Sequence, residues 1–167
     1  MKSHMVFSAL LLISSVVASA QQVEVNYNHN QSFAGYHTYA WVSNNQNQIQ
    51  NSILAQTAKQ DIDAALQAKG LQMVEETQSP DLLVLANGGL RQQTSYSAYG
   101  MRGVGGGFGT ISPQQSEEGT LIVDLHDAKT KSLVWRGIAQ DTLSNKGGKN
   151  QQMVGKAVQK MFKQWPK

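Results

Sequence analysis

The chain has 167 residues, of which 40% are hydrophobic and 15% are charged, a balance typical of one globular domain and unlike that of disordered or fibrous chains. It contains no cysteine, which excludes disulfide frameworks, thiolate metal sites, thiol nucleophiles and cysteine lipidation. The formal net charge of +3 is too small to indicate nucleic-acid binding without a concentrated basic patch, so no nucleic-acid partner is expected.

Residues 1–20 have the pattern of a secretory signal peptide. The basic Lys2 precedes an apolar run over 5–17, and Ala18-Ser19-Ala20 is the small-residue pattern that signal peptidase accepts. We expect cleavage after Ala20 and a single mature domain over 21–167, located in the periplasm or secreted. The run is shorter than the ~20 residues of a membrane-spanning helix, and no later apolar run approaches that length, so no transmembrane segment is expected after signal removal. Gln21 stands where a bacterial lipoprotein carries its acylated cysteine, so no lipid anchor is expected.

Four segments in the first half of the mature domain predict strands. Apolar and polar residues alternate over 23–27, and the segment 38–42 is rich in aromatic and β-branched residues. A short strand is expected over 71–75. The apolar run 81–86, closed by the turn-forming residues 87–89, predicts a strand near the sheet centre that is buried on both faces.

Two segments predict amphipathic helices. Apolar residues recur at three- and four-residue spacing from Ile49 to Leu66, and Gly70 is expected to end this helix in the left-handed conformation. A second apolar stripe runs from Val154 to Trp165. We expect this helix to close the domain.

The segment between these helices predicts a loop and a hairpin. Residues 96–109 are dense in glycine, and we expect a surface loop there. The segments 119–125 and 133–139 predict a hairpin, with Leu133 and Trp135 available to contact the core. This order of elements favours an α+β fold: a single mixed, largely antiparallel sheet packed by two amphipathic helices, with a Gly-rich loop.

Five segments carry a resemblance to a known family. They are Phe33–Trp41, Leu66–Leu71, Pro80–Val84, Gly119–Leu125 and Leu133–Gly137. In this order they resemble the bacterial domain-of-unknown-function family numbered 4136, and the resemblance spans nearly all of the mature chain. It implies an exported envelope protein, often a lipoprotein, with an α+β fold, no assigned activity and no catalytic residues to carry over. The missing lipid-bearing cysteine departs from the family pattern.

The spacing of residues disfavours a cofactor or metal site. Phe108 stands where a dinucleotide fingerprint needs glycine, and Asn150 stands where a P-loop needs Ser or Thr. The mature histidines His29, His37 and His126 lack helical ligand spacing. We therefore expect no cofactor and no metal.

The leading hypothesis is a non-catalytic binding or assembly module of the cell envelope, and an envelope hydrolase is the alternative. No Gly-x-Ser-x-Gly elbow occurs in the chain. The hydrolase would take its acid–base groups from Asp124, His126 and Asp141.

Two groups of side chains are candidate binding surfaces. The first lies in and beside the Gly-rich loop and comprises Tyr96, Tyr99, Arg102 and Phe108. The second is a basic face of the terminal helix and comprises Lys149, Lys156, Lys160 and Lys163. Such a face suits peripheral attachment to an anionic membrane or polymer. The partner is unknown, and the candidates are an envelope protein or an anionic lipid or glycan.

Overall fold

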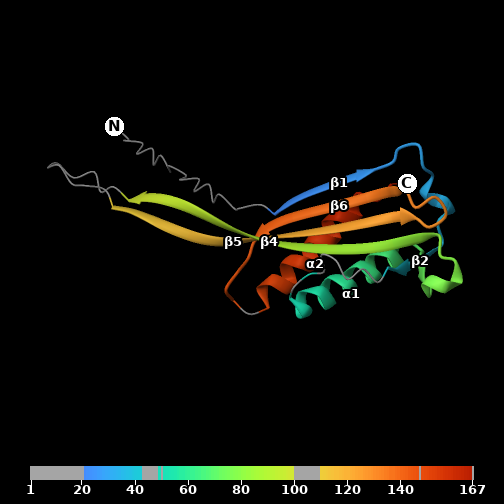
Figure 1. Cartoon of the computed structure of the whole chain (residues 1–167), viewed down its shortest axis with the longest axis horizontal. Coiled ribbons are helices and arrows are strands. Elements are labelled where there is room, and N and C mark those ends of the chain that lie inside the picture. Colours follow the sequence, from blue (N-terminus) through green and yellow to red (C-terminus); the bar gives the residue numbers. More distant parts are fainter. Residues whose placement is uncertain (1–20, 43–48, 50, 100–109, 147, 167) are drawn as a thin grey trace, which may run out of the picture.

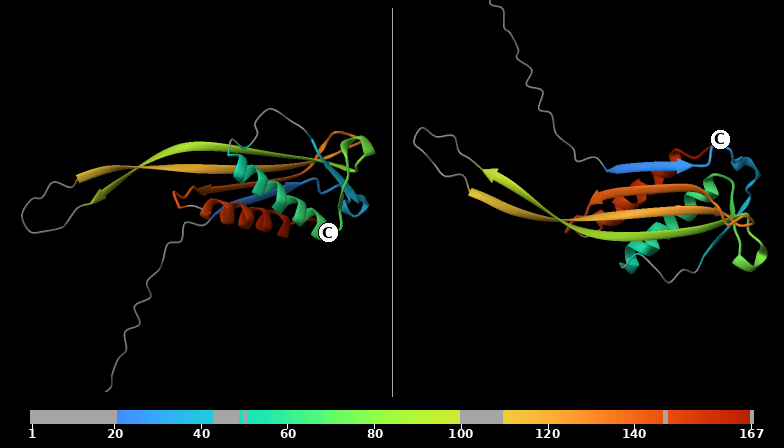
Figure 2. Two further views of the ribbon diagram at one scale, coloured as in Figure 1. Left: turned by 90° about the horizontal axis from the view of Figure 1, so that it is seen from below. Right: turned by 45° about the horizontal axis from the view of Figure 1, so that its top comes forward.

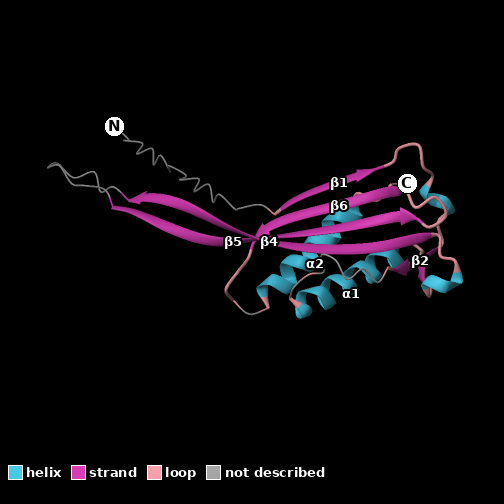
Figure 3. Cartoon of the chain, in the orientation of Figure 1, coloured by secondary structure: helices cyan, strands magenta, loops and turns pink. Residues whose placement is uncertain are grey.

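The computed structural model describes residues 21–42, 49, 51–99, 110–146 and 148–166. Within these ranges, six strands form one sheet and two α-helices cover one of its faces (Figures 1 and 3). The elements are β1 (Gln22–Tyr27), β2 (Thr38–Trp41), α1 (Ser52–Ala68), β3 (Gln72–Met73), β4 (Leu82–Tyr99), β5 (Thr110–Asp127), β6 (Leu133–Thr142) and α2 (Lys149–Lys163), with short 3-10 helices at Phe33–Gly35 and Glu76–Gln78.

The sheet is mixed and mainly antiparallel. Its strand order is β1-β6-β5-β4-β2-β3. Only β2 runs parallel to its neighbours β3 and β4, and the other described pairs are antiparallel. The predicted α+β fold with two helices on one sheet is confirmed. No helix in the described ranges is long and apolar enough to cross a membrane.

The core lies between the sheet and the two helices. Trp135 of β6 and Tyr39 of β2 are fully buried there beneath Ile62 of α1 and Met161 of α2. The Tyr39 hydroxyl donates to Asp63 of α1 at 2.9 Å. This contact joins α1 to the parallel end of the sheet.

The ends of α1 follow from local chemistry. Asn51 caps the helix, because its side-chain oxygen accepts the amides of Ile53 and Leu54, each at 3.1 Å. The helix therefore begins after Asn51 and not at Ile49. At the other end Gly70 has φ +89°, which confirms its predicted left-handed conformation.

Strands β4 and β5 are much longer than predicted. Residues 87–89 do not end β4, and 96–99 belong to the strand, so both expectations were wrong. β5 begins at Thr110, nine residues before the predicted segment. One unbroken antiparallel register pairs the two strands along their whole length, and this pairing outweighs the weak strand propensity of glycine and glutamine. The rest of the predicted Gly-rich loop, 100–109, lies outside the described residues.

The predicted hairpin of β5 and β6 is confirmed, with one irregularity. Leu125 pairs with Trp135, but the next residue, His126, pairs with Leu133. This bulge adds a residue to β6, so Val134 is buried and Leu133 is 40% exposed. The expectation that Leu133 faces the core was wrong, because the bulge shifts the alternation of faces.

Candidate functional site: an apolar pocket at the root of a β-arm

Strands β4 and β5 continue beyond the helices as a two-stranded arm (Figures 1 and 2). We define the β-arm as residues 93–99 and 110–116. β2 pairs with β4 only as far as Val84. On the other side, the last backbone hydrogen bond to β5 runs from the Leu143 amide, just after β6, to the Glu117 carbonyl. In the described part of the chain, both edges of the β-arm therefore lack a partner strand. The side chains of 93–96 and 112–115 are exposed, and Tyr96 is 74% exposed.

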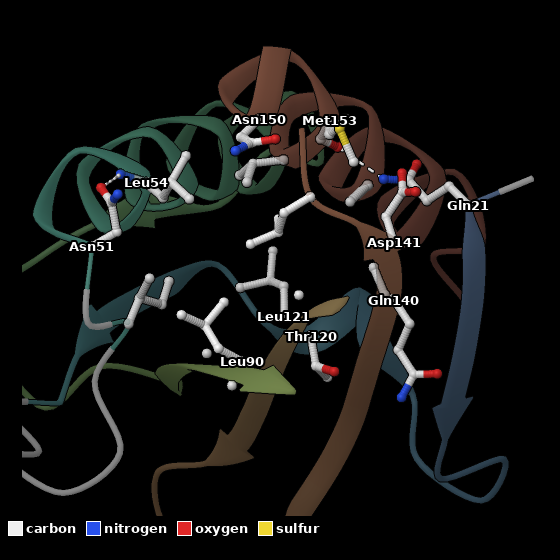
Figure 4. Close-up of a pocket in the computed structure, with 18 residues that line it drawn as sticks. Gln21, Asn51, Leu54, Leu90, Thr120, Leu121, Gln140, Asp141, Asn150 and Met153 are labelled. Atoms are coloured by element: carbon white, nitrogen blue, oxygen red, sulfur yellow. Dashed lines mark hydrogen bonds between the residues drawn. The ribbon is translucent and has the colours of Figure 1, made fainter. Parts of the chain in front are cut away.

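A pocket of about 190 Å³ lies where the β-arm leaves the body (Figure 4). Leu90 of β4, Leu121 of β5 and Ala139 of β6 line it from the sheet. Leu54 of α1 and Val154 of α2 line it from the helices. With Gln21, which precedes β1, six separate parts of the chain build one mainly apolar pocket.

Two strand glycines shape the walls of this pocket. A Cβ atom on Gly88 would lie 2.6 Å from Cγ1 of Ile49, and one on Gly119 would lie 2.8 Å from Cδ2 of Leu143. Ile49 and Leu143 also line the pocket. Each therefore rests directly on the sheet backbone, which only glycine permits.

Three of the four amide side chains around the pocket are hydrogen-bonded within the chain. Asn51 caps α1, and Asn150 accepts the Ser144 amide at 2.8 Å and donates to its carbonyl at 3.0 Å. Gln21 donates to the Met153 carbonyl at 2.9 Å. These bonds hold the walls in place and leave an apolar interior. An apolar group is therefore the chemical complement of the pocket.

The hydrolase candidates do not converge. Asp124 is 6% exposed and accepts both a 2.6 Å and a 2.7 Å hydrogen bond from the Arg136 guanidinium. This bonding raises the pKa of Arg136. Asp141 lies at the pocket, on the helix side of the sheet, and pairs with Gly119 of β5. Asp124 is on the opposite face of the sheet, about 17 Å along β5 from Gly119. Nδ1 of His126 lies 3.2 Å from the carbonyl oxygen of Lys131 in the β5–β6 turn.

The described residues therefore show no positive sign of catalysis. Asp124 and His126 share a face, but the structure does not bring Asp141 to them. Nor do these ranges contain a group of three or more His, Asp or Glu side chains that could hold a metal ion.

The predicted binding residues lie on two separate parts of the molecule. Tyr96 lies on the β-arm, whereas the four lysines lie along α2 in the body and are exposed. The backbone of Tyr99 is in β4 and its side chain is not described. Arg102 and Phe108 lie outside the described residues. Sequence reasoning missed the pocket, although Gly88 and Gly119 within apolar segments were a usable signal of a close approach.

Comparison with known proteins identifies a family and a fold. The family model described as "Domain of unknown function (DUF4136)" matches residues 23–167. No curated protein matches the chain. A DUF4136 family protein from Bacteroides thetaiotaomicron VPI-5482 has a similar structure, with a TM-score of 0.55 and 15% identity over 86% of this chain and 95% of that one.

Two other solved structures share the fold. A PDZ domain protein from Parabacteroides distasonis ATCC 8503 has a TM-score of 0.59 and 15% identity, and the match covers 87% of this chain but only 36% of that chain. The PelC dodecamer from Paraburkholderia phytofirmans has a TM-score of 0.51 and 13% identity over 85% of this chain and 94% of that one. At these identities the likeness extends to the fold alone.

Proposed function

The chain belongs to the DUF4136 family, and on that premise we propose that it is an exported, non-catalytic assembly module in which the β-arm of one copy docks into the pocket of the next. The observation that carries this proposal is the separation of two complementary features. An exposed aromatic side chain, Tyr96, lies on the β-arm, and an apolar pocket lies at the root of that arm.

Tyr96 is out of reach of the pocket in its own chain. Six residues separate it from Leu90, the last β4 residue that lines the pocket, which corresponds to about 20 Å of extended strand. The register of β4 with β5 holds the arm extended over this length. The aromatic ring is therefore available only to another molecule.

The pocket has the size and chemistry to accept the ring of Tyr96. An engineered protein cavity of roughly 150 Å³ holds benzene, and this pocket measures about 190 Å³. A buried tyrosine hydroxyl needs a hydrogen-bond partner. Asp141 lines the pocket and its Oδ1 accepts the Thr142 amide at 2.8 Å. A carboxylate has room for further bonds, so Asp141 would accept one from the docked phenol.

The edges of the β-arm, beside which the described part of the chain places no third strand, favour association. A two-stranded ribbon without a packed face is marginally stable in water, and free strand edges are templates for pairing with another chain. Docking would cover part of the arm and give it a packing partner. Arm and pocket are different surfaces. A head-to-tail contact, in which the partner does not return its own arm to the first copy, builds a closed ring or a filament.

Three further observations support the proposal. The PelC structure, which shares the fold, is a dodecamer. The signal-like segment 1–20 supports export. A protein that assembles after export needs no reactive centre, and the scattered positions of Asp124, His126 and Asp141 agree with a non-catalytic role.

Complementation between two defective variants tests this proposal. Tyr96→Ala removes the anchor and keeps the pocket, whereas Val154→Phe fills the pocket and keeps the arm. Thr94→Ala, two residues along the same strand, is the matched control for the arm. We expect wild type and Thr94→Ala to form assemblies larger than a dimer in sedimentation velocity, and each of the two defective variants to be monomeric.

Mixing the two defective variants gives the sharper result. One intact arm and one intact pocket remain, so the mixture should form one-to-one dimers and nothing larger. A monomeric wild type at all concentrations would contradict the proposal. Assembly of Tyr96→Ala at wild-type strength would contradict the role of the arm.

A further inference from the structure

Four lysines form a straight row on the outer side of α2, which we call the lysine stripe. Its members are Lys149, Lys156, Lys160 and Lys163, and all are exposed. Their spacings of seven, four and three residues confine them to an arc of about 60° around the helix. From Lys149 to Lys163 the row is about 21 Å long. The sequence of α2 contains no acidic residue.

The lysine stripe points away from the protein body. The buried residues of α2 are Ala157, Val158, Met161 and Phe162, and they lie roughly opposite the stripe around the helix. Core packing therefore fixes how α2 is rotated about its own axis, and it keeps the row of lysines on the surface of the protein.

No carboxylate in the described ranges neutralises the stripe. The two ion pairs found there are Lys59 with Asp63 and Arg136 with Asp124. The nearest element to α2 is α1, whose Asp61 faces Gly155, with 3.2 Å between Oδ2 and a Cβ built on the glycine. Burial raises the pKa of Asp61, which is the opposite of the effect of a neighbouring lysine.

We propose that the lysine stripe binds the headgroups of an anionic lipid bilayer and attaches the protein to its surface. The charge of the stripe complements such a surface, and its straightness lets all four ammonium groups meet a flat plane at once. Each lysine close to an anionic membrane strengthens binding roughly fivefold at moderate salt. Four together would strengthen it several hundredfold.

This attachment is independent of the proposed assembly. The stripe lies on α2, whereas docking uses the β-arm and the pocket. Tyr96→Ala would therefore abolish assembly and leave membrane binding by each single chain in place. Loss of one property without the other separates the two proposals.

Vesicle co-sedimentation with matched charge variants tests the inference. The vesicles contain phosphatidylcholine with or without phosphatidylglycerol. Lys156→Gln with Lys160→Gln removes two charges from the stripe. The control, Lys129→Gln with Lys131→Gln, removes two exposed charges from the β5–β6 turn and reaches the same net charge. Thermal unfolding of both double variants verifies that they are folded.

We expect the protein to bind only the vesicles that contain phosphatidylglycerol. This binding should weaken as added salt shortens the screening length. The stripe variant should bind about 25-fold more weakly than wild type, from two losses of roughly fivefold, and the control should bind within about threefold of wild type. Equal weakening in both variants would show a diffuse charge effect and overturn the proposal. Tighter binding to dextran sulfate than to vesicles, with the same dependence on the stripe, would identify a polymer partner and also overturn it.

Discussion

Replacement of Gly137 by alanine is a direct test of how the core is packed. Gly137 lies two residues after Trp135 on the same face of β6, and the buried indole extends across it. A Cβ atom at Gly137 would lie 2.7 Å from Cη2 of Trp135 and 2.8 Å from Sδ of Met161. Optimal contacts between heavy atoms are about 3.5–4.0 Å, so the methyl group would overlap both neighbours by about 1 Å.

Neither neighbour has space into which it can retreat. Trp135 and Met161 are fully buried, and the indole also packs on Phe162 with 4.9 Å between ring centroids. Overpacking of a core by one methyl group costs about 1–3 kcal/mol. Because two buried groups are displaced, we expect Gly137→Ala to lower the free energy of unfolding by about 2–3 kcal/mol.

Urea unfolding, followed by tryptophan fluorescence and circular dichroism, measures this loss. With an m-value of about 2 kcal/mol/M, the midpoint should fall by about 1 M or more. Gly89→Ala is the matched control, because Gly89 is also a strand glycine and a Cβ atom there meets nothing within 4 Å. It should leave the midpoint unchanged or raise it slightly. Equal midpoints for the two variants would refute the assignment of Gly137 as a packing requirement.

Three further predictions concern a helix cap, a pH dependence and processing. Asn51→Ala removes the acceptor that caps α1 and should cost about 1 kcal/mol of stability in the same urea assay; a loss below ~0.3 kcal/mol would contradict the capping role. Asp81 accepts hydrogen bonds from donors at the start of β2, and these bonds lower the pKa of its carboxyl group. The ionised carboxylate therefore stabilises the fold fully above the unfolded-state pKa of ~3.9. This contribution is lost as the pH falls through the lower folded-state pKa. Asp81→Asn should therefore be less stable than wild type at pH 7, and this difference should vanish under acid, whereas a constant difference across pH would be inconsistent with the ionic contribution. Mass spectrometry of the exported protein should give a mature N-terminus at Gln21, and an intact Met1 on the exported chain would show that the signal is not cleaved.

Predictions that depend on near neighbours in the sequence were the accurate ones. The alternation over 23–27 and the apolar stripe of α2 each specify an element by its periodicity alone. The left-handed Gly70 follows from the position of glycine just after a helix. In each case the residues that decide the outcome lie within a few positions of one another.

Predictions failed where a distant strand decides the outcome. Residues 87–89 are turn-forming by composition, yet they stay in β4 because β5 pairs with them throughout. Leu133 is exposed because a bulge, which depends on the alignment of β6 against β5, moves Val134 into the core. Cross-strand pairing is a relation between two segments, and neither segment encodes it alone.

The sequence alone was enough to specify the fold class and the two amphipathic helices, because periodicity and local caps are short-range properties. It also placed four lysines on one face of α2. The pocket and the free edges of the β-arm required the tertiary structure. Six separated parts of the chain meet at the pocket, and the arm exists because β2 and β6 end before β4 and β5 do. Such long-range contacts arise only when the whole chain packs.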